Sequence, residues 1–203
     1  MPGVPARPPR WLVATKVVLI GLLVLGAAFP SVGGFEGKGM TFRLPVFALP
    51  ALLVPVATAV RRRGAAYPTG LDAALTLPFT VDTAANAVGL YDHVDATDDV
   101  LHLVNWVLLV AGITLHLERR IARVGAPRVV VWLAGLGVGA VAIIGWEVCE
   151  YGVMQWGVAG LDLTYGDTLG DLVLSTVGGG IGAAAALWWS RRPPVERVRA
   201  GSG

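Results

Sequence analysis

Apolar residues form six long runs that are separated by short polar segments. The runs cover residues 11–32, 44–60, 72–90, 98–117, 129–151 and 169–190. A helix needs about 20 mainly apolar residues to cross the hydrocarbon core of a bilayer, and every run is close to that length. The pattern predicts an all-α integral membrane protein of about six transmembrane helices, with one domain at 11–190 and polar tails at 1–10 and 191–203.

Two of the runs are less regular than the others. The second is short and contains Pro45, Pro50 and Pro55, which predict a kinked or irregular helix. The third is the least apolar, because it includes Asp82 and Asn86. The first run is longer than the apolar part of a secretory signal, which is about 7–15 residues, so we interpret it as an uncleaved span.

The composition also favours lipid over water as the surrounding solvent. Of the 203 residues, 55% are hydrophobic and 15% are charged, with a mean hydropathy of +0.66. A soluble domain carries about 25% charged residues. No basic segment interleaved with aromatic residues supports nucleic-acid binding. The single cysteine, Cys149, excludes an intrachain disulfide, and its apolar surroundings predict a small core residue.

The charged residues predict the direction of the crossings. Thirteen of the sixteen basic residues fall in alternate connections, and basic residues near span ends stay on the cytoplasmic side. Eleven of the fourteen acids fall in the other connections or at the adjoining span ends. Both termini are therefore predicted to be cytoplasmic, in the plasma membrane, with the acidic face outside. Lys16 is expected to reach the interface from the first span.

Four of the predicted spans carry polar pairs at the same predicted depth. Residues three or four apart share a helix face, and the pairs are Asp82 with Asn86, Asp98 with His102, Glu147 with Glu150, and Asp167 with Asp171. Asn105 and Tyr151 lie on adjoining turns. Charged groups are costly inside a membrane, so we expect these side chains to face one another within the bundle.

No Lys or Arg lies among these pairs, and the nearest are Lys38 and Arg43 in the first outer loop. Either several carboxyl groups are protonated or a divalent cation sits among them. Carboxylates suit Mg²⁺, Ca²⁺ or Mn²⁺, and an imidazole ligand admits Zn²⁺ or Fe²⁺. The candidate metal ligands are Asp98, His102, Glu147, Glu150, Asp167 and Asp171. His102 and Glu147 are also the candidate catalytic residues, and Asp82, Asn86, Asn105 and Tyr151 are supporting polar residues.

Each pair also has a structural interpretation. Asp98 and Asp167 sit where helices are expected to begin, so both could serve as helix caps or first-turn acids. His102 could be a hydrogen-bonded core histidine. Glu147 is the hardest to explain structurally, because it lies inside an apolar run. The glycines at 135–145 and 178–182 are expected to let helices pack closely.

Four short motifs occur in order between residues 71 and 190. They are Gly89-Leu90-Tyr91-Asp92, Asp98-x-x-Leu101-His102, Trp146-Glu147-x-x-Glu150-Tyr151 and Asp167-Thr168-x-x-Asp171-Leu172 with Gly178–Gly180. Together they resemble the YjdF-like family of bacterial membrane proteins, a domain of unknown function. A weaker resemblance is to the VanZ-like family.

The chain departs from both families at two places. Asp99 stands where these families usually carry Lys, and Asn105-Trp106 replace a small Ser-Gly pair. If that lysine partly neutralises the family site, this chain depends more on a cation.

Three functions remain open from the sequence. The first is an enzyme acting at the outer membrane surface on a lipid or lipid-linked head group, with a cation that polarises a phosphoryl or carbonyl oxygen. No serine or cysteine nucleophile with a nearby base is evident, which argues against a covalent mechanism. The second is a cation- or proton-coupled transporter, although the inner halves of the spans hold few ionisable groups. The third is a binding or sensory protein that holds an ion or lipid without turnover.

Overall fold

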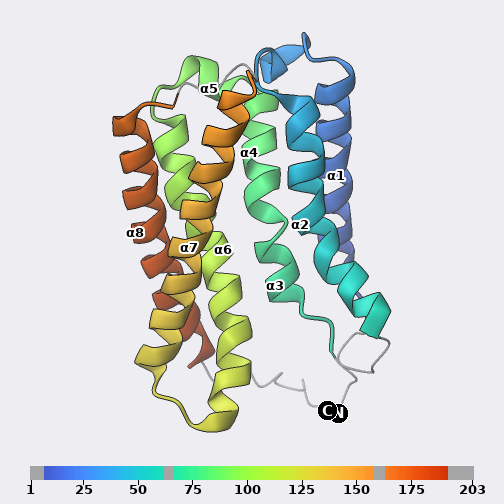
Figure 1. Cartoon of the computed structure of the whole chain (residues 1–203). Coiled ribbons are helices and arrows are strands. Elements are labelled where there is room, and N and C mark those ends of the chain that lie inside the picture. The colour runs from blue at the N-terminus through green and yellow to red at the C-terminus, as the bar shows by residue number, and fades with distance from the viewer. Residues whose placement is uncertain (1–6, 62–65, 158–162, 192–203) are drawn as a thin grey trace, which may run out of the picture.

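The structure, a computed structural model, describes residues 7–61, 66–157 and 163–191, which form a bundle of roughly parallel and antiparallel helices (Figure 1). The helices are α1 (Arg10–Ala28), α2 (Met40–Arg61), α3 (Thr69–Ala74), α4 (Leu77–Ala87), α5 (Leu90–His93), α6 (Thr97–Ile121), α7 (Arg128–Gln155) and α8 (Tyr165–Ser190). Short 3₁₀ turns lie at Gly33–Phe35 and Ala122–Val124. These described residues contain no strand, which confirms the predicted all-α class.

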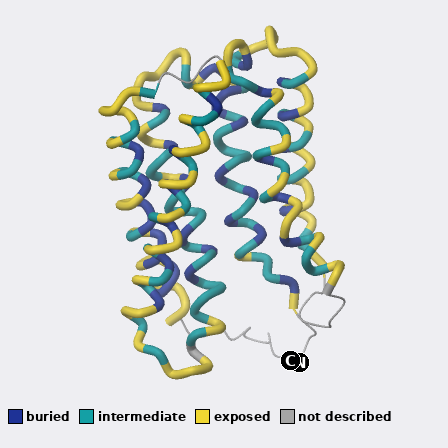
Figure 2. Tube along the Cα trace, viewed as in Figure 1, coloured by how far each residue is buried: buried dark blue, intermediate teal, exposed yellow. Residues whose placement is uncertain are grey.

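Five of the described helices are long and apolar enough to cross a membrane, namely α1, α2, α6, α7 and α8. Large apolar side chains on them point away from the bundle, such as Val17 at 67% exposed and Val141 at 71%. Figure 2 shows exposed positions along the outer sides of these helices, while buried positions line the interior. In a soluble protein this surface would be unfavourable, but in a bilayer it contacts lipid.

The predicted third span is a pair of short helices, α3 and α4, that follow one another along the bundle (Figure 1). The break lies at Leu75 and Thr76, just before Pro78. Proline donates no backbone hydrogen bond, and its ring collides with the carbonyl four residues earlier, here that of Ala74. Both helices pack against α6. The broken element therefore occupies the interior, which explains why its sequence is the least apolar.

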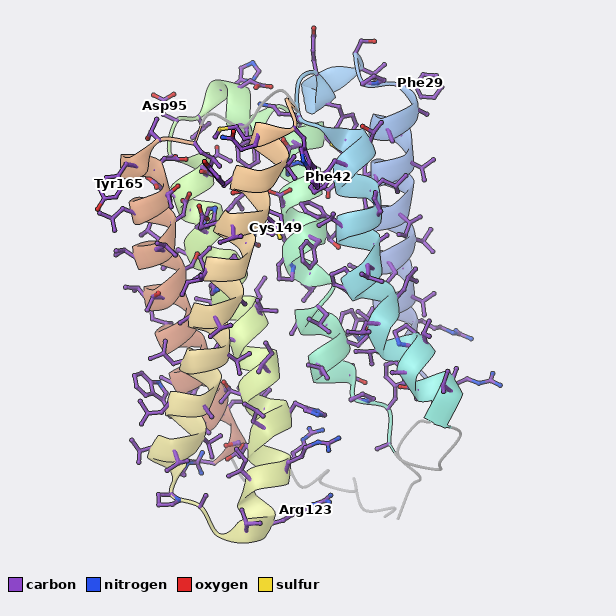
Figure 3. All side chains as sticks on the ribbon, in the orientation of Figure 1. Phe29, Phe42, Asp95, Arg123, Cys149 and Tyr165 are labelled. Carbon is purple, nitrogen blue, oxygen red and sulfur yellow. The ribbon has the colours of Figure 1, made fainter. Side chains whose placement is uncertain are left out.

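We name the two ends of the bundle by their charge. The acidic end is formed by the α1–α2 connection at residues 29–39, by residues 88–96 around α5, and by the start of α8. The basic end is formed by the last turn of α6 and the connection at residues 122–127, which includes Arg123. Figure 3 labels Phe29 and Asp95 at the first end and Arg123 at the second.

The prolines of α2 do not interrupt it, and the helix runs unbroken through Pro45, Pro50 and Pro55. A proline at position 55 leaves the carbonyl of Ala51 without its usual helical donor. The ammonium group of Lys16 on α1 donates a hydrogen bond to that carbonyl. A side chain from the neighbouring helix thus offsets the free-energy cost of the carbonyl that the proline leaves unpaired.

Lys16 also forms a buried ion pair rather than reaching the interface as expected. Its Nζ lies 2.6 Å from Oδ1 of Asp72, whose side chain is fully buried in α3. The phenol of Tyr67 donates to the other oxygen of Asp72 at 2.6 Å. Burial and this hydrogen bond raise the pKa of Tyr67, so the phenol stays protonated. This cluster joins α1, α2 and α3.

Helices α6 and α8 pack with their backbones in contact, as the glycine runs predict. A side-chain carbon added at Gly178 would collide with the carbonyl oxygen of Leu103, and one at Gly182 with that of Val107. The two glycines lie four residues apart on α8, and the two carbonyls lie four residues apart on α6. We call this line of backbone contact the α6–α8 seam, and it fixes the register of the two helices. One and two turns before Gly178, the same face of α8 carries Ser175 and Asp171.

Candidate functional site

The α6–α8 seam brings a histidine and two carboxylates together at the acidic end. Nε2 of His102 lies 3.5 Å from Oδ1 of Asp171 and 3.8 Å from Oδ1 of Asp98. One ligand atom from each of these three residues lies within 4.8 Å of the other two. The side chain of Asp171 is 4% exposed and that of His102 is 11% exposed, while Asp98 is more open at 43%. We call these three residues the Asp–His cluster.

The other ring nitrogen of His102 has a partner of its own. Nδ1 lies 3.1 Å from Oγ of Ser175, and the ring stacks on Trp106 with centroids 5.8 Å apart. These contacts orient the ring so that Nε2 faces the two carboxylates. A serine beside a base is thus present, contrary to the sequence interpretation. Ser175 is fully buried, however, so it can position the imidazole but cannot reach a substrate as a nucleophile.

Divalent cations fit the geometry of the Asp–His cluster. Bonds of about 2.0–2.6 Å to nitrogen and oxygen place two ligands of one cation up to about 4–5 Å apart. The separations within the cluster fall in this range. A hydrogen-bonded histidine nitrogen opposite the ligating nitrogen is also what metal-binding histidines commonly show.

Glu147 on α7 is buried, and no basic side chain of the described residues pairs with it. Its exposed fraction is 7%, and neither carboxylate oxygen has a hydrogen-bond partner among the described residues. Asp98 and Asp167 lie close enough for their charges to act on it. A bare carboxylate in such a place is strongly unfavourable. Glu147 therefore requires either a proton or a cation.

Asp82 is neutralised within the protein, which corrects the prediction that no basic residue lies among the polar pairs. Because α2 begins at Met40, Arg43 belongs to the helix and not to the preceding loop. Its guanidinium group lies 2.7 Å from Oδ2 of Asp82. The phenol of Tyr91 donates to Oδ1 at 2.6 Å. Burial and the charge of Asp82 raise the pKa of Tyr91, so it remains a donor.

A cavity of about 160 Å³ joins the Asp–His cluster to the Arg43–Asp82 pair. It lies between α2, α4, α6 and α7. Its polar lining consists of Arg43, Asp82, Tyr91, Asp98, His102, Asn105 and Glu150, and its apolar lining consists of Phe47, Pro78, Phe79, Leu101, Trp106, Leu109, Ala142 and Trp146. Glu150 lines this cavity, whereas Glu147 faces a separate surface depression together with Thr168.

Several residues from the predicted set lie outside the cluster. Asp167 is exposed in the first turn of α8, where its backbone N–H bonds to Oγ1 of Thr164. Tyr151 is 58% exposed. Asn86 is buried and donates to the backbone of Asp82, so it supports α4 and not the cation ligands. Asn105 is buried in the cavity wall with its carbonyl oxygen unpaired.

Cys149 is exposed, not buried as predicted from its apolar surroundings. In a membrane protein an apolar run faces lipid as readily as the core, so hydropathy alone cannot assign the side. Cys149 borders a narrow groove of about 30 Å³ between α2 and α7, together with Phe42 and Val46 (Figure 3). The groove and the main cavity share Arg43, Phe47, Trp146 and Glu150 in their walls.

These features define a helical membrane protein with a polar site at one end of its bundle. The chain belongs to the family described as predicted membrane proteins DUF2238, whose family model matches residues 11–192. The match confirms the membrane class and agrees with the resemblance to the YjdF-like family. The resemblance to the VanZ-like family stays a prediction. No curated protein and no solved structure shows significant similarity to the chain.

Proposed function

We propose that the protein is a cation-dependent membrane enzyme that acts on the head group of a lipid or lipid-linked molecule. The observation that carries this proposal is that two members of the Asp–His cluster, Asp98 and His102, line a cavity among the membrane helices, and that the separations within the cluster suit a divalent cation. A bound cation would polarise a phosphoryl or carbonyl oxygen of the substrate. The charge pattern supports an extracytoplasmic position for the acidic end, in the plasma membrane.

The proposed role of each side chain at the site follows from its position. His102, with Nδ1 bonded to Ser175, offers Nε2 as a ligand together with Asp98 and Asp171. Of the two glutamates on α7, we assign the role of general base to Glu150 because it lines the cavity. Glu147 then acts beside the cluster, where it contributes negative charge that favours a cation. Arg43 and Tyr91 hold Asp82 and shape the opposite wall.

The first test is the metal content of the purified protein. We expect a stoichiometric divalent cation that is lost in His102→Ala and in Asp171→Asn. Asp95→Asn is the matched control, since it removes an exposed acid at the same end of the bundle (Figure 3) and should leave the cation in place. The cation-bound protein and Glu150→Gln are then incubated with native lipid extract. A lipid species consumed by the wild type but not by Glu150→Gln supports catalysis. No change in any lipid contradicts it, and a retained cation would then favour a binding or sensory protein.

One structural observation favours transport as a second candidate function. Lys16, Asp72 and Tyr67 form a buried titratable cluster away from the acidic end. The sequence indicates few ionisable groups in this inner part of the spans. Such intramembrane pairs often mark proton or ion paths. Proteoliposomes loaded with a pH-sensitive dye test this function. Proton flux that depends on Asp72 supports transport, and the absence of flux under imposed ion gradients contradicts it.

A further inference from the structure

The cavity has a polar end and an apolar body, and this division indicates what kind of molecule it holds. Asp98, His102 and Glu150 supply the polar end, while Phe47, Phe79 and Trp146 form part of the apolar wall. The three aromatic rings are in contact: Phe47 lies 4.8 Å from Phe79 and 5.7 Å from Trp146 between ring centroids. A ligand that satisfies both surfaces is amphiphilic.

The groove between α2 and α7 provides a route to the cavity from the side of the bundle. Phe42, Val46 and Cys149 border the groove. Phe47 and Trp146 contribute to the walls of both spaces, as do Arg43 and Glu150, so these four side chains stand between them. Among the described helices, α2 and α7 lack the close backbone packing that joins α6 to α8. Side chains, which can rotate, therefore form most of the barrier between lipid and the cavity.

We propose that the ligand is a membrane lipid whose acyl chain passes between α2 and α7 into the cavity, while its head group lies at the Asp–His cluster. This inference rests on the proposed function and deepens it by naming the substrate class and its direction of approach. The groove lies between two membrane-spanning helices near the acidic end, and its wall carries Lys38, Arg43 and Glu150 beside Phe42, Val46 and Val153.

Photocrosslinking tests the proposal directly. The full-length protein is reconstituted in phosphatidylcholine vesicles containing a phosphatidylcholine analogue with a diazirine in its acyl chain. After irradiation and digestion, the modified residues are mapped by mass spectrometry. We expect adducts on Phe47, which is only 2% exposed, and on Phe79 and Trp146, besides those on the outer surface. Adducts confined to outward-facing residues would overturn the proposal.

Adjacent positions on α7 supply a matched pair of variants. Ala142→Phe fills the cavity, whereas Val141→Phe adds the same ring to a side chain that is 71% exposed. The interior adducts should be lost in the first variant and retained in the second. If Ala142→Phe does not fold, Val46→Trp narrows the groove instead and should give the same loss. Interior adducts that persist when the cavity or groove is filled would refute this route.

The experiment separates the two proposals. Interior adducts in a protein that binds no cation would support the lipid site and overturn the proposed function. A bound cation without interior adducts would leave the proposed function standing and remove lateral access by lipid. Asp171→Asn should lose the cation but keep the interior adducts, because the acyl chain lies among aromatic side chains.

Discussion

Oγ of Ser175 lies 3.1 Å from Nδ1 of His102, so the hydroxyl group determines which ring nitrogen faces the carboxylates. Partners of this kind typically change metal affinity by about 10–100-fold when removed. We therefore expect Ser175→Ala to weaken cation binding by about that factor while the protein remains folded.

Calorimetric titration of the metal-free protein measures this effect. Thr176→Ala is the control, since Thr176 is exposed and its hydroxyl bonds only to the backbone of Leu172 in the described structure. Unchanged affinity in Ser175→Ala would mean that Ser175 does not orient a ligand. An equal loss in both variants would indicate a general effect on α8.

The α6–α8 seam predicts a large difference between glycines that look equivalent in the sequence. A methyl group at Gly178 would collide with the carbonyl of Leu103, whereas one at Gly145 would meet nothing within 4 Å. Overpacking of this kind costs about 1–3 kcal/mol, and Gly→Ala in an open helix position is neutral or favourable. Gly178→Ala should therefore lower the thermal unfolding temperature in detergent, and Gly145→Ala should not.

The same variant also tests how the site is positioned. Since the seam sets the register of α8, Gly178→Ala should weaken cation binding without changing any candidate ligand. A destabilised variant that retains full cation affinity would show that Asp171 and Ser175 are held by other contacts.

The helical membrane class follows from hydropathy, because a bilayer requires long apolar helices. The meeting of Asp98, His102 and Asp171 was also predicted, since their spacing places them on shared faces near the predicted starts of neighbouring helices. Hydropathy could not locate the start of α2, because a glycine-rich segment with two cations precedes the apolar run. Arg43 was therefore assigned to a loop, although one helical turn separates it from Phe47 in the same helix.

The buried pair of Lys16 and Asp72 was missed for a different physical reason. A single charge near the end of an apolar run is usually satisfied at the interface, and the two residues are far apart in sequence. The pair depends on which helices pack together: α1 packs against α2 and α4, and α2 also contacts α3. One signal was present: Pro55 predicted an unpaired carbonyl at Ala51 that needs a donor.

Membrane orientation can be tested with a cysteine placed at Ala96, which is exposed at the acidic end. The background is Cys149→Ala, so that the new thiol is the only one. An impermeant thiol reagent should label intact cells expressing Ala96→Cys, because the charge pattern predicts that this end faces outside. A cysteine at Val124, which is 80% exposed in the connection at the basic end, should be labelled only after lysis. The reverse pattern would invert the proposed topology.

The pair of Lys16 and Asp72 allows a stability test in which charge and packing are separated. Replacing one partner leaves the other buried and unpaired, which typically costs about 3–5 kcal/mol. Lys16→Met and Asp72→Asn should therefore each destabilise the protein strongly in detergent unfolding. The double variant Lys16→Met with Asp72→Asn leaves no unpaired charge, so it should lose much less than the sum of the two. If the losses simply add, the two side chains act independently. The loss of stability that remains in the double variant reports the carbonyl of Ala51, which Lys16 supplies with a hydrogen-bond donor in the wild type.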